Sequence, residues 1–329
     1  REFRAALSQV RGTASPRAPL YLSNLAFHLA ELGELPEARR AAEEGLQAAQ
    51  RFSNRSLETS CHEALAQILA QGGDLDGALA ALKRAEELNA GLRMEVIALD
   101  LLVLRGRIFC ARGQYRRAVE FLAQAIERLA GRPDAPQLTE FRATLAWCEL
   151  RAGRVRVARD LLQSLVAPAD AEENDFQRMR VHYWLGEARQ ALGERRNVDA
   201  HLSKALKLVR ERGYLYFLRV QAREEPAPLL YALARGIETD VVSAALVEAG
   251  VAIEESLLAQ LADAPPAAAE AVVALLGEVG GRAAHEAFER LGHTRRSLQP
   301  ALRTARRHIA ERLARGAMGG IEDEARVPR

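Results

Sequence analysis

Residues 25–45 read LAFHLAELGELPEARRAAEEG, and a related pattern returns four more times at intervals of 40 residues. The last copy, at residues 185–205, reads LGEARQALGERRNVDAHLSKA. A glycine stands at the centre of each copy, and these glycines are Gly33, Gly73, Gly113, Gly153 and Gly193. Self-similarity at a fixed period of this length is typical of repeat architectures. The pattern therefore predicts a row of similar units.

Each central glycine has small or apolar neighbours at fixed distances. Seven residues before it stand Ala26, Ala66, Gly106, Ala146 and Gly186. Five residues after it stand Ala38, Ala78, Ala118, Ala158 and Val198. Nine residues after it stand Ala42, Leu82, Leu122, Leu162 and Leu202, and twelve after it stand Gly45, Ala85, Ala125, Leu165 and Ala205. Glycine ends a helix in the left-handed conformation at little steric cost, and small residues let two helices approach closely. Each unit is therefore predicted to be a helix, a tight turn and an antiparallel helix.

This pattern resembles the tetratricopeptide repeat (TPR). In the first unit, the positions of the family's Leu-Gly pair, turn glycine and two alanines hold Leu25, Ala26, Gly33, Ala38 and Gly45. The resemblance covers residues 15–212, with Arg105, Leu165 and Val198 as departures and a period of 40 instead of about 34 residues. Long repeats of this type are similar to the helical sensor domain of MalT-like bacterial transcription regulators, which are signalling ATPases. The resemblance implies an all-α fold, a right-handed TPR superhelix.

The repeat phase ends after Gly213. Four segments are predicted: an N-terminal helix or frayed end at 1–14, five TPR-like pairs at 15–213, a smaller helical region at 214–315, and a disordered tail at 316–329. Short alanine-rich helices in the third segment resemble HEAT repeats. The predicted helix pairs are 17–32 with 35–52, 56–71 with 75–89, 91–112 with 115–130, 137–152 with 155–167, and 175–192 with 195–212. An acidic loop is expected at 168–174.

Composition favours close-packed helices and argues against several functional classes. Apolar residues make up 49% of the 329 residues and aromatic residues only 5%. Lys and Arg total 46 against 44 acidic residues, so the net charge of +2 gives no global attraction to nucleic acid. The cysteines Cys61, Cys110 and Cys148 have no metal-ligand spacing and favour a reducing cytoplasm. No apolar run reaches the roughly 18 residues of a membrane span. The missing initial Met suggests a fragment of a longer protein.

Catalytic motifs are absent from the sequence. It contains no G-x-x-x-x-G-K-[ST] phosphate loop, no H-E-x-x-H and no G-x-S-x-G. Seven scattered histidines form no ligand pair; His182, for example, is expected to be a partly exposed helix residue. We therefore expect neither an enzyme nor a cofactor or metal.

The TPR resemblance implies a concave groove lined by the first helix of each pair. One column of the groove is Phe27, Gln67, Arg107, Trp147 and Glu187; the next is Ser23, Glu63, Val103, Ala143 and Tyr183; a third is Leu20, Ser60, Asp100, Glu140 and Arg180. Aromatic and Arg side chains are the usual anchors of recognition surfaces. The predicted binding residues are Phe27, Glu63, Gln67, Arg107, Trp147, Arg180, Tyr183 and Glu187. Alternatively, Trp147 and Tyr183 pack between helices.

A second candidate surface is the basic C-terminal helix expected at 298–315. Arg303, Arg307 and, one turn back, Arg296 can share a face that could meet phosphates. The alternative is a solvated helix face or the end cap of a solenoid.

These features favour a non-catalytic scaffold that binds a protein, a peptide or a small-molecule effector in the groove. The resemblance implies the sensor region of a larger bacterial signalling or transcription-regulatory protein, with further domains on the same polypeptide and no membrane segment. A free-standing adaptor that holds a partner peptide or helix is the alternative. Nucleic-acid binding through the basic C-terminal helix is a further, less favoured alternative.

Overall fold

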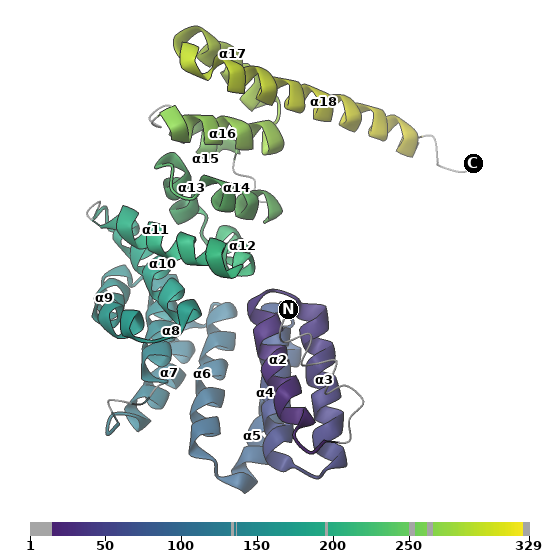
Figure 1. Ribbon diagram of the computed structural model, residues 1–329, viewed down its shortest axis with the longest axis vertical. Helices are drawn as coiled ribbons and strands as arrows, with labels where there is room; N and C mark the ends of the chain where they lie inside the picture. Colours follow the sequence, from purple (N-terminus) through teal and green to yellow (C-terminus); the bar gives the residue numbers. More distant parts are fainter. Residues whose placement is uncertain are drawn as a thin grey trace. The chain divides into compact units, whose positions relative to one another are not determined.

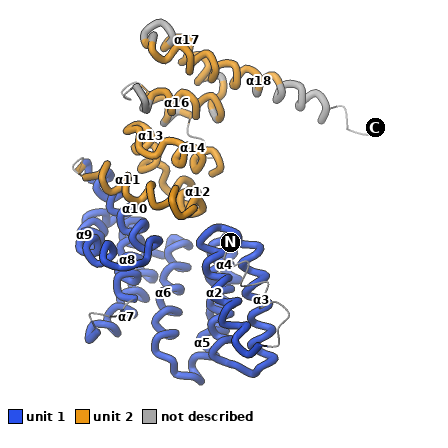
Figure 2. The backbone as a smooth tube through the Cα atoms, in the orientation of Figure 1, with its two compact units in different colours: residues 1–193 blue, residues 194–329 orange. Residues whose placement is uncertain are grey.

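The computed structural model describes residues 15–132, 135, 137–194, 197–249, 254–261 and 266–324. Every regular element in these ranges is a helix, as the sequence predicts (Figure 1). The chain forms two compact units, unit 1 with residues 1–193 and unit 2 with residues 194–329 (Figure 2). The predicted N-terminal segment 1–14 lies outside the described residues.

Unit 1 consists of helices of 14 to 18 residues that follow one another as antiparallel hairpins. The helices are α2 (Ala18–Glu31), α3 (Leu35–Arg51), α4 (Arg55–Gln71), α5 (Leu75–Leu92), α6 (Glu95–Ala111), α7 (Tyr115–Arg128), α8 (Leu138–Arg151), α9 (Val155–Ala171) and α10 (Asp175–Ala191). We call α2, α4, α6, α8 and α10 the first helices, because each precedes a turn glycine.

The five periodic glycines all adopt the left-handed conformation, with φ between 71° and 86°. At Gly113 the backbone N–H donates to the carbonyl of Cys110 (2.8 Å), and the N–H of Gln114 donates to that of Phe109 (2.9 Å). This pair of bonds satisfies carbonyls that the end of a helix leaves free, and it recurs after α2, α4 and α8. No heavy atom would lie within 4 Å of a Cβ at Gly113, so backbone conformation requires the glycine there.

The small and apolar columns form the core between the hairpins. Ala118 and Leu122 of α7 are fully buried, as are their counterparts in α5 and α9. Gly106 of α6 lies so close to α7 that a Cβ there would come within 2.7 Å of Leu122 Cγ. Close packing of this kind lets a chain with few aromatic residues bury apolar surface efficiently.

Side-chain caps fix where several first and second helices begin. Asn54, Asp74 and Asn174 each precede a helix and accept a hydrogen bond from the backbone N–H three residues later (2.9–3.1 Å). Asn89 instead bridges two hairpins, since its amide bonds both the N–H and the carbonyl of Met94. These bonds satisfy orphan backbone groups and help to hold the hairpins in register.

Unit 2 contains shorter helices that do not continue the 40-residue pattern. They are α11 (Val198–Arg212), α12 (Leu215–Glu224), α13 (Ala227–Ala234), α14 (Thr239–Glu248), α15 (Glu254–Leu261), α16 (Pro266–Val279), α17 (Arg282–Thr294), the 3-10 turn η1 (Arg296–Leu298) and α18 (Gln299–Glu324). The backbone of α16 approaches α18 closely, because a Cβ at Gly277 would come within 2.9 Å of Ala305. The HEAT-like grouping of these helices stays a prediction.

Three boundaries differ from those expected. Helix α9 continues to Ala171, so most of the loop predicted at 168–174 is helical. Pro168 lies inside this helix, because the buried residues Leu165 and Ala169 continue its apolar face. Helix α18 runs to Glu324, into the tail predicted to be disordered, since an internal glycine weakens a helix without ending it. The compact units separate at 193/194, whereas the repeat pattern predicts a boundary at 213.

Candidate functional site

Charged side chains from all five first helices of unit 1 come close enough to influence one another's ionisation. We call this group the charged cluster. It consists of Glu31 of α2, Glu63 of α4, Asp100 and Arg107 of α6, Glu140 of α8, and Arg180 of α10. These interactions join side chains of the first helices, and the groove that the resemblance implies for those helices stays a prediction.

The acidic side of the charged cluster resists ionisation. Burial, followed by the like charges of Asp100 and Glu140, raises the pKa of Glu63 to about 8. Burial and then Glu140 raise the pKa of Asp100 to about 7. In the described part of the chain, neither Glu63 nor Asp100 forms a hydrogen bond or an ion pair. A largely buried carboxylate without such partners is costly, so burial favours the neutral form of both groups.

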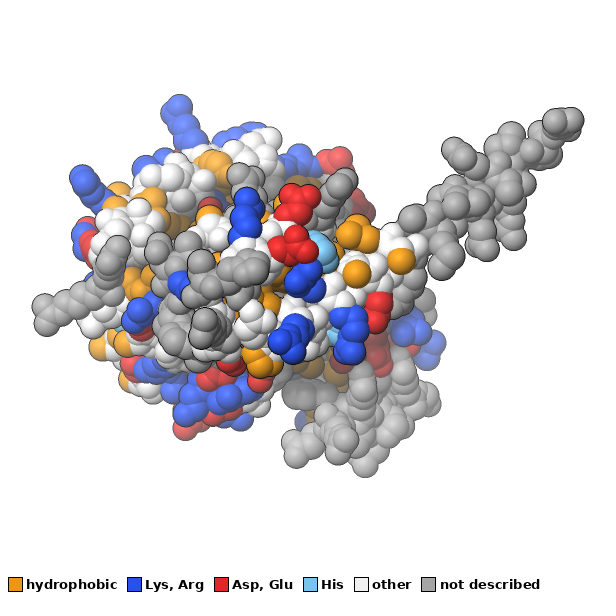
Figure 3. All heavy atoms as spheres, turned by 90° about the horizontal axis from the view of Figure 1, so that it is seen from above, with side chains coloured by type: hydrophobic (Ala, Val, Ile, Leu, Met, Phe, Trp, Pro, Cys, Tyr) orange, Lys and Arg blue, Asp and Glu red, His pale blue; other side chains and the backbone are white. Residues whose placement is uncertain are grey.

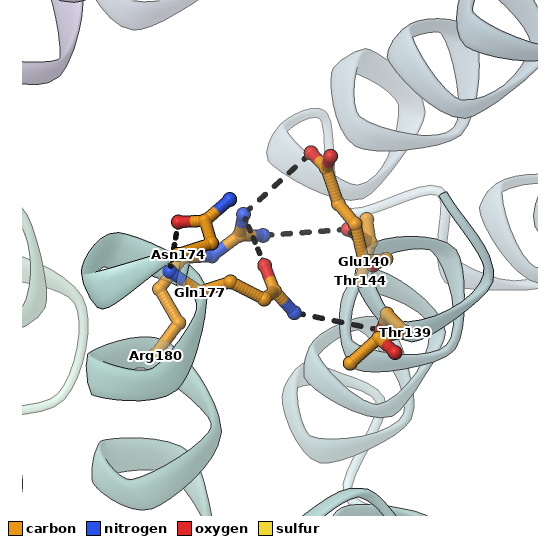
Figure 4. A network of polar contacts seen from close by, with 6 residues as sticks. All are labelled: Thr139, Glu140, Thr144, Asn174, Gln177 and Arg180. Carbon is orange, nitrogen blue, oxygen red and sulfur yellow. Dashed lines mark hydrogen bonds and ion pairs between the residues drawn. The ribbon is translucent and has the colours of Figure 1, made fainter. Parts of the chain in front are cut away.

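Arg180 is the deeply buried member of the charged cluster, with 7% of its surface exposed. Burial is the main cause that lowers its pKa to about 10, and Arg107 lowers it further, while Glu140 and Glu31 oppose the shift. Its guanidinium donates to Thr144 Oγ1 (3.3 Å) and to Gln177 Oε1 (3.4 Å), and Glu140 Oε1 lies 3.8 Å away (Figure 4). Both hydrogen bonds go to neutral partners, Gln177 one turn away on α10 and Thr144 on α8, and the ion pair with Glu140 is longer than a hydrogen bond.

Gln177 connects Arg180 to the start of α10 and to α8. Its backbone N–H donates to the side chain of Asn174, the N-cap of α10 (2.9 Å), and its Nε2 lies 3.5 Å from the carbonyl of Thr139 (Figure 4). The cap fixes the first turn of α10, and the amide ties that turn to α8. Arg180, one turn further along, is therefore held at a defined place beside Thr144 and Glu140.

Aromatic rings flank the Arg180 guanidinium. Its Cζ lies 4.7 Å from the ring centroid of Trp184 and 5.6 Å from that of Phe176. Trp184 in turn stacks on Trp147 of α8, with centroids 6.2 Å apart. Nε1 of Trp147 is buried and has no hydrogen-bond partner among the described residues. Cation–π contacts compensate part of the burial cost of Arg180 and fix the plane of its guanidinium.

Comparison with known proteins identifies the repeat. A family model described as the MalT-like TPR region matches residues 3–235, more than half of the chain. The chain belongs to this TPR family. The match extends past the predicted end of the repeats at 213, into α12 and α13. No curated protein matches the chain by sequence.

Solved structures of Rap proteins share the TPR fold. A Rap protein complexed with competence and sporulation factor is 12% identical, with a TM-score of 0.60 over 94% of this chain and 80% of that one. The Rap conjugation gene regulator of plasmid pLS20, in complex with the Phr* peptide, is 14% identical, with a TM-score of 0.57 over 90% of this chain and 74% of that one. The apo form of RapI is 13% identical, with a TM-score of 0.53 over 75% and 87%. At these identities the likeness shows the fold, an all-α TPR solenoid, as predicted.

The residues predicted for the TPR groove divide into two groups. Phe27, Glu63, Gln67, Arg107 and Trp147 are partly exposed. Arg180, Tyr183 and Glu187 are buried: Tyr183 is fully buried, Arg180 is 7% exposed, and Glu187 is 4% exposed in an ion pair with Arg151. The expectation that Tyr183 lies on an accessible surface is corrected in favour of the packing alternative, because α10 is buried along its whole length from Met179 to Ala188.

Several residues around Arg180 were not predicted. Thr144, Gln177 and Trp184 contact it, but none occupies a column that the family assigns to the groove. Trp184 directly follows Tyr183 in the sequence and so points about 100° further around α10. His182, expected to be partly exposed, is 3% exposed and bonds Asp170 (3.1 Å) within the extended end of α9.

The basic surface of α18 is mixed in charge. Arg303 and Arg307 are exposed, four residues apart, while Leu302, Ala305 and Ile309 on the other side are buried. Arg307 lies 3.9 Å from Glu311, Arg306 pairs with Glu289 (2.6 Å), and basic and acidic side chains are interspersed on this face (Figure 3). Arg296 belongs to η1, before α18 begins, and a face that it shares with Arg303 and Arg307 stays a prediction. This arrangement fits a solvated helix face.

Other chemistry finds little support in the described part of the chain. No group of three or more His, Cys, Asp or Glu side chains there could hold a metal ion. Cys61, Cys110 and Cys148 are free and buried, and burial raises the pKa of the Cys61 thiol to about 12, which makes it unreactive. None of the described helices combines the length and apolar character of a membrane span.

Proposed function

We propose that this TPR chain is a non-catalytic regulatory scaffold that binds a peptide effector at the charged cluster of unit 1. The observation that carries the proposal is the charged cluster itself: Gln177 and Trp184 hold Arg180 in place with a long ion pair to Glu140 (3.8 Å), and the partly exposed Arg107 acts on it as a second cation. Buried charges in stable proteins are normally paired. A second cation that is partly exposed at this place is suited to a negatively charged group of a ligand.

The folds compared above support a peptide as the ligand. Two of the Rap structures are described as complexes, one with competence and sporulation factor and one with the Phr* peptide. Family membership supports a sensor role within a larger bacterial signalling or transcription-regulatory protein. In such a protein, peptide binding would bias the state of a further domain through its differential affinity for two conformations.

An array of immobilised short peptides of varied sequence, probed with the purified full chain, tests this proposal. We expect a limited set of peptides to be retained, and expect Arg107→Gln to lose most of that set. Arg116→Gln on α7, whose side chain is 93% exposed, is the matched control and should retain it. Failure of the wild-type chain to retain any peptide would contradict the proposal.

A further inference from the structure

The turns that carry the periodic glycines change the sign of their charge halfway along unit 1. Each turn is taken here from two residues before its glycine to four residues after it. The first two turns, at 31–37 and 71–77, hold five acidic residues and no basic one. The next two turns, at 111–117 and 151–157, hold six arginines and no acidic residue.

Contacts between neighbouring hairpins place these turns side by side. A Cβ at Gly72 would lie 3.9 Å from Leu35 Cδ1, so the second turn adjoins the first. Arg112 of the third turn donates a hydrogen bond to Asp76 of the second, which joins the two turns where the sign of the charge changes.

The third and fourth turns also adjoin. Cys110 and Cys148, at the turn ends of α6 and α8, belong to one buried cluster, and their thiols are in contact. The same offset of 38 residues separates Gln177 from Thr139, whose carbonyl it contacts, so this neighbour relation recurs between first helices. The four turns therefore form one edge of unit 1, which we call the turn edge, and their charges follow the order acidic, acidic, basic, basic.

Each basic turn presents a cation that the described chain does not neutralise. Arg117 of the third turn and Arg156 of the fourth are exposed, and neither forms an ion pair with another described residue. The other four arginines of these turns pair with carboxylates of unit 1. The Arg117 guanidinium lies 4.8 Å from the ring centroid of Phe109 and donates to Gln114 Oε1 (3.2 Å), so it is held in place with its charge uncompensated.

We propose that the turn edge binds the turn edge of a second copy of this chain, antiparallel, so that the acidic turns of each copy meet the basic turns of the other. A row ordered acidic, acidic, basic, basic is complementary to itself when a two-fold axis passes between its second and third turns. A partner of uniform charge, such as a nucleic acid, would match only half of the row. This surface and its partner are separate from the peptide site proposed above.

Apolar side chains at the outer turns fit the same arrangement. Leu32 in the first turn is 39% exposed, and Val157 in the fourth is 47% exposed. The two-fold axis brings the first turn of one copy against the fourth turn of the other, so each end of the interface buries an apolar pair. Burial of this surface adds a contribution that salt does not screen.

Sedimentation velocity of the full chain tests the proposal. We expect a concentration-dependent dimer whose Kd rises about 10-fold or more from about 0.05 M to about 1 M salt, where the Debye length is about 3 Å. Arg117→Glu combined with Arg156→Glu should weaken the dimer about 100-fold or more, because like charges replace opposite ones in both halves of the interface.

Lys83→Glu combined with Arg84→Glu is the matched control. Both residues are exposed on α5 outside the turns, and the change in net charge is the same, so this variant should dimerise like the wild type. A wild-type chain that stays monomeric at low salt, or a dimer that the reversal of Arg117 and Arg156 leaves unchanged, would overturn the proposal.

A mixture of two variants separates loss of binding from loss of folding. Glu37→Arg combined with Asp76→Arg reverses one residue in each acidic turn, and this variant alone should also be mainly monomeric. Mixed with the Arg117→Glu, Arg156→Glu variant, it places opposite charges together again at each reversed position, so we expect a heterodimer with an affinity close to that of the wild type. If both variants keep the circular dichroism of the wild type and form no heterodimer, the antiparallel pairing is wrong.

Discussion

In unit 1 the second helices repeat their buried residues with little change, whereas equivalent positions of the first helices differ from one repeat to the next. Ala78, Ala118 and Ala158 are all fully buried. The column that contains Asp100 instead continues with Glu140 and then with Arg180. The first set is fixed by the close approach of helices, which tolerates few side chains. The second set is free of this packing constraint, and charged side chains of both signs occupy it.

The largest effect on stability should come from the buried residues of the second helices. Leu122→Ala removes a fully buried side chain that lies against Gly106 of α6, and we expect it to reduce the free energy of unfolding by about 3 kcal/mol. Val157→Ala on α9, where 47% of the side chain is exposed, should cost less than about 0.5 kcal/mol. Urea denaturation measures both, and equal effects would argue against the buried columns as the source of stability.

Glu63→Gln tests the charged positions of the first helices, and we expect it to stabilise the protein. A carboxyl group whose pKa rises from 4.5 to about 8 on folding destabilises the folded state increasingly as pH rises through this window. The neutral amide removes that cost, so we expect a gain on the order of 2 kcal/mol at pH 8.5 that disappears near pH 4.5.

The control for this effect is Glu127→Gln on α7, an exposed residue that should leave stability unchanged at both values of pH. A loss of stability in Glu63→Gln at pH 8.5 would mean that favourable contacts within the fold already satisfy the Glu63 carboxylate.

Peptide binding should depend on pH through the same groups. The charges of Asp100 of α6 and Glu140 of α8 act on Glu63 of α4, and with pKa values of about 8 for Glu63 and about 7 for Asp100 these two carboxyl groups ionise as pH rises. For an N-acetylated peptide with an Arg side chain, whose own charge is constant here, affinity should rise about 10-fold from pH 6 to pH 8.5. The Glu63→Gln, Asp100→Asn variant should show a flat profile. An equally flat wild-type profile would contradict the prediction.

The smallest expected effect distinguishes two glycines that differ in backbone conformation. Gly113→Ala forces a side chain into the left-handed conformation and should destabilise the protein by about 1 kcal/mol. Gly91→Ala, within α5 and with open space around it, should stabilise by about 0.5 kcal/mol or more. Thermal unfolding of the two variants should give shifts of opposite sign, and shifts of the same sign would refute the role assigned to the turn glycines.

The fold was largely predictable because its rules act over short distances in the sequence. The turn at Gly113 and the close approach at Gly106 depend on residues within about two helical turns of the hairpin. The end of α9 was missed because Pro168 is a strong local breaker, while the apolar contacts of Ala169 that outweigh it come from the tertiary structure.

The candidate site was predictable only in part. The resemblance selected Glu63, Arg107 and Arg180, but it also selected Tyr183, which is buried, and not Trp184, which contacts Arg180. A small rotation of a helix about its axis decides which of two neighbouring side chains makes such a contact. The repeat pattern of the sequence does not fix this rotation. The grouping of like charges arises from contacts among helices far apart in the chain, so it becomes visible only in the structure.

Photo-crosslinking tests the central claim most directly. A retained peptide that carries a photoreactive group is irradiated with the full chain, and mass spectrometry then maps the attachment site. The account predicts crosslinks on α4, α6 and α8, close to Glu63, Asp100 and Glu140. Crosslinks confined to the second helices α3, α5 and α7, or to α18, would contradict it.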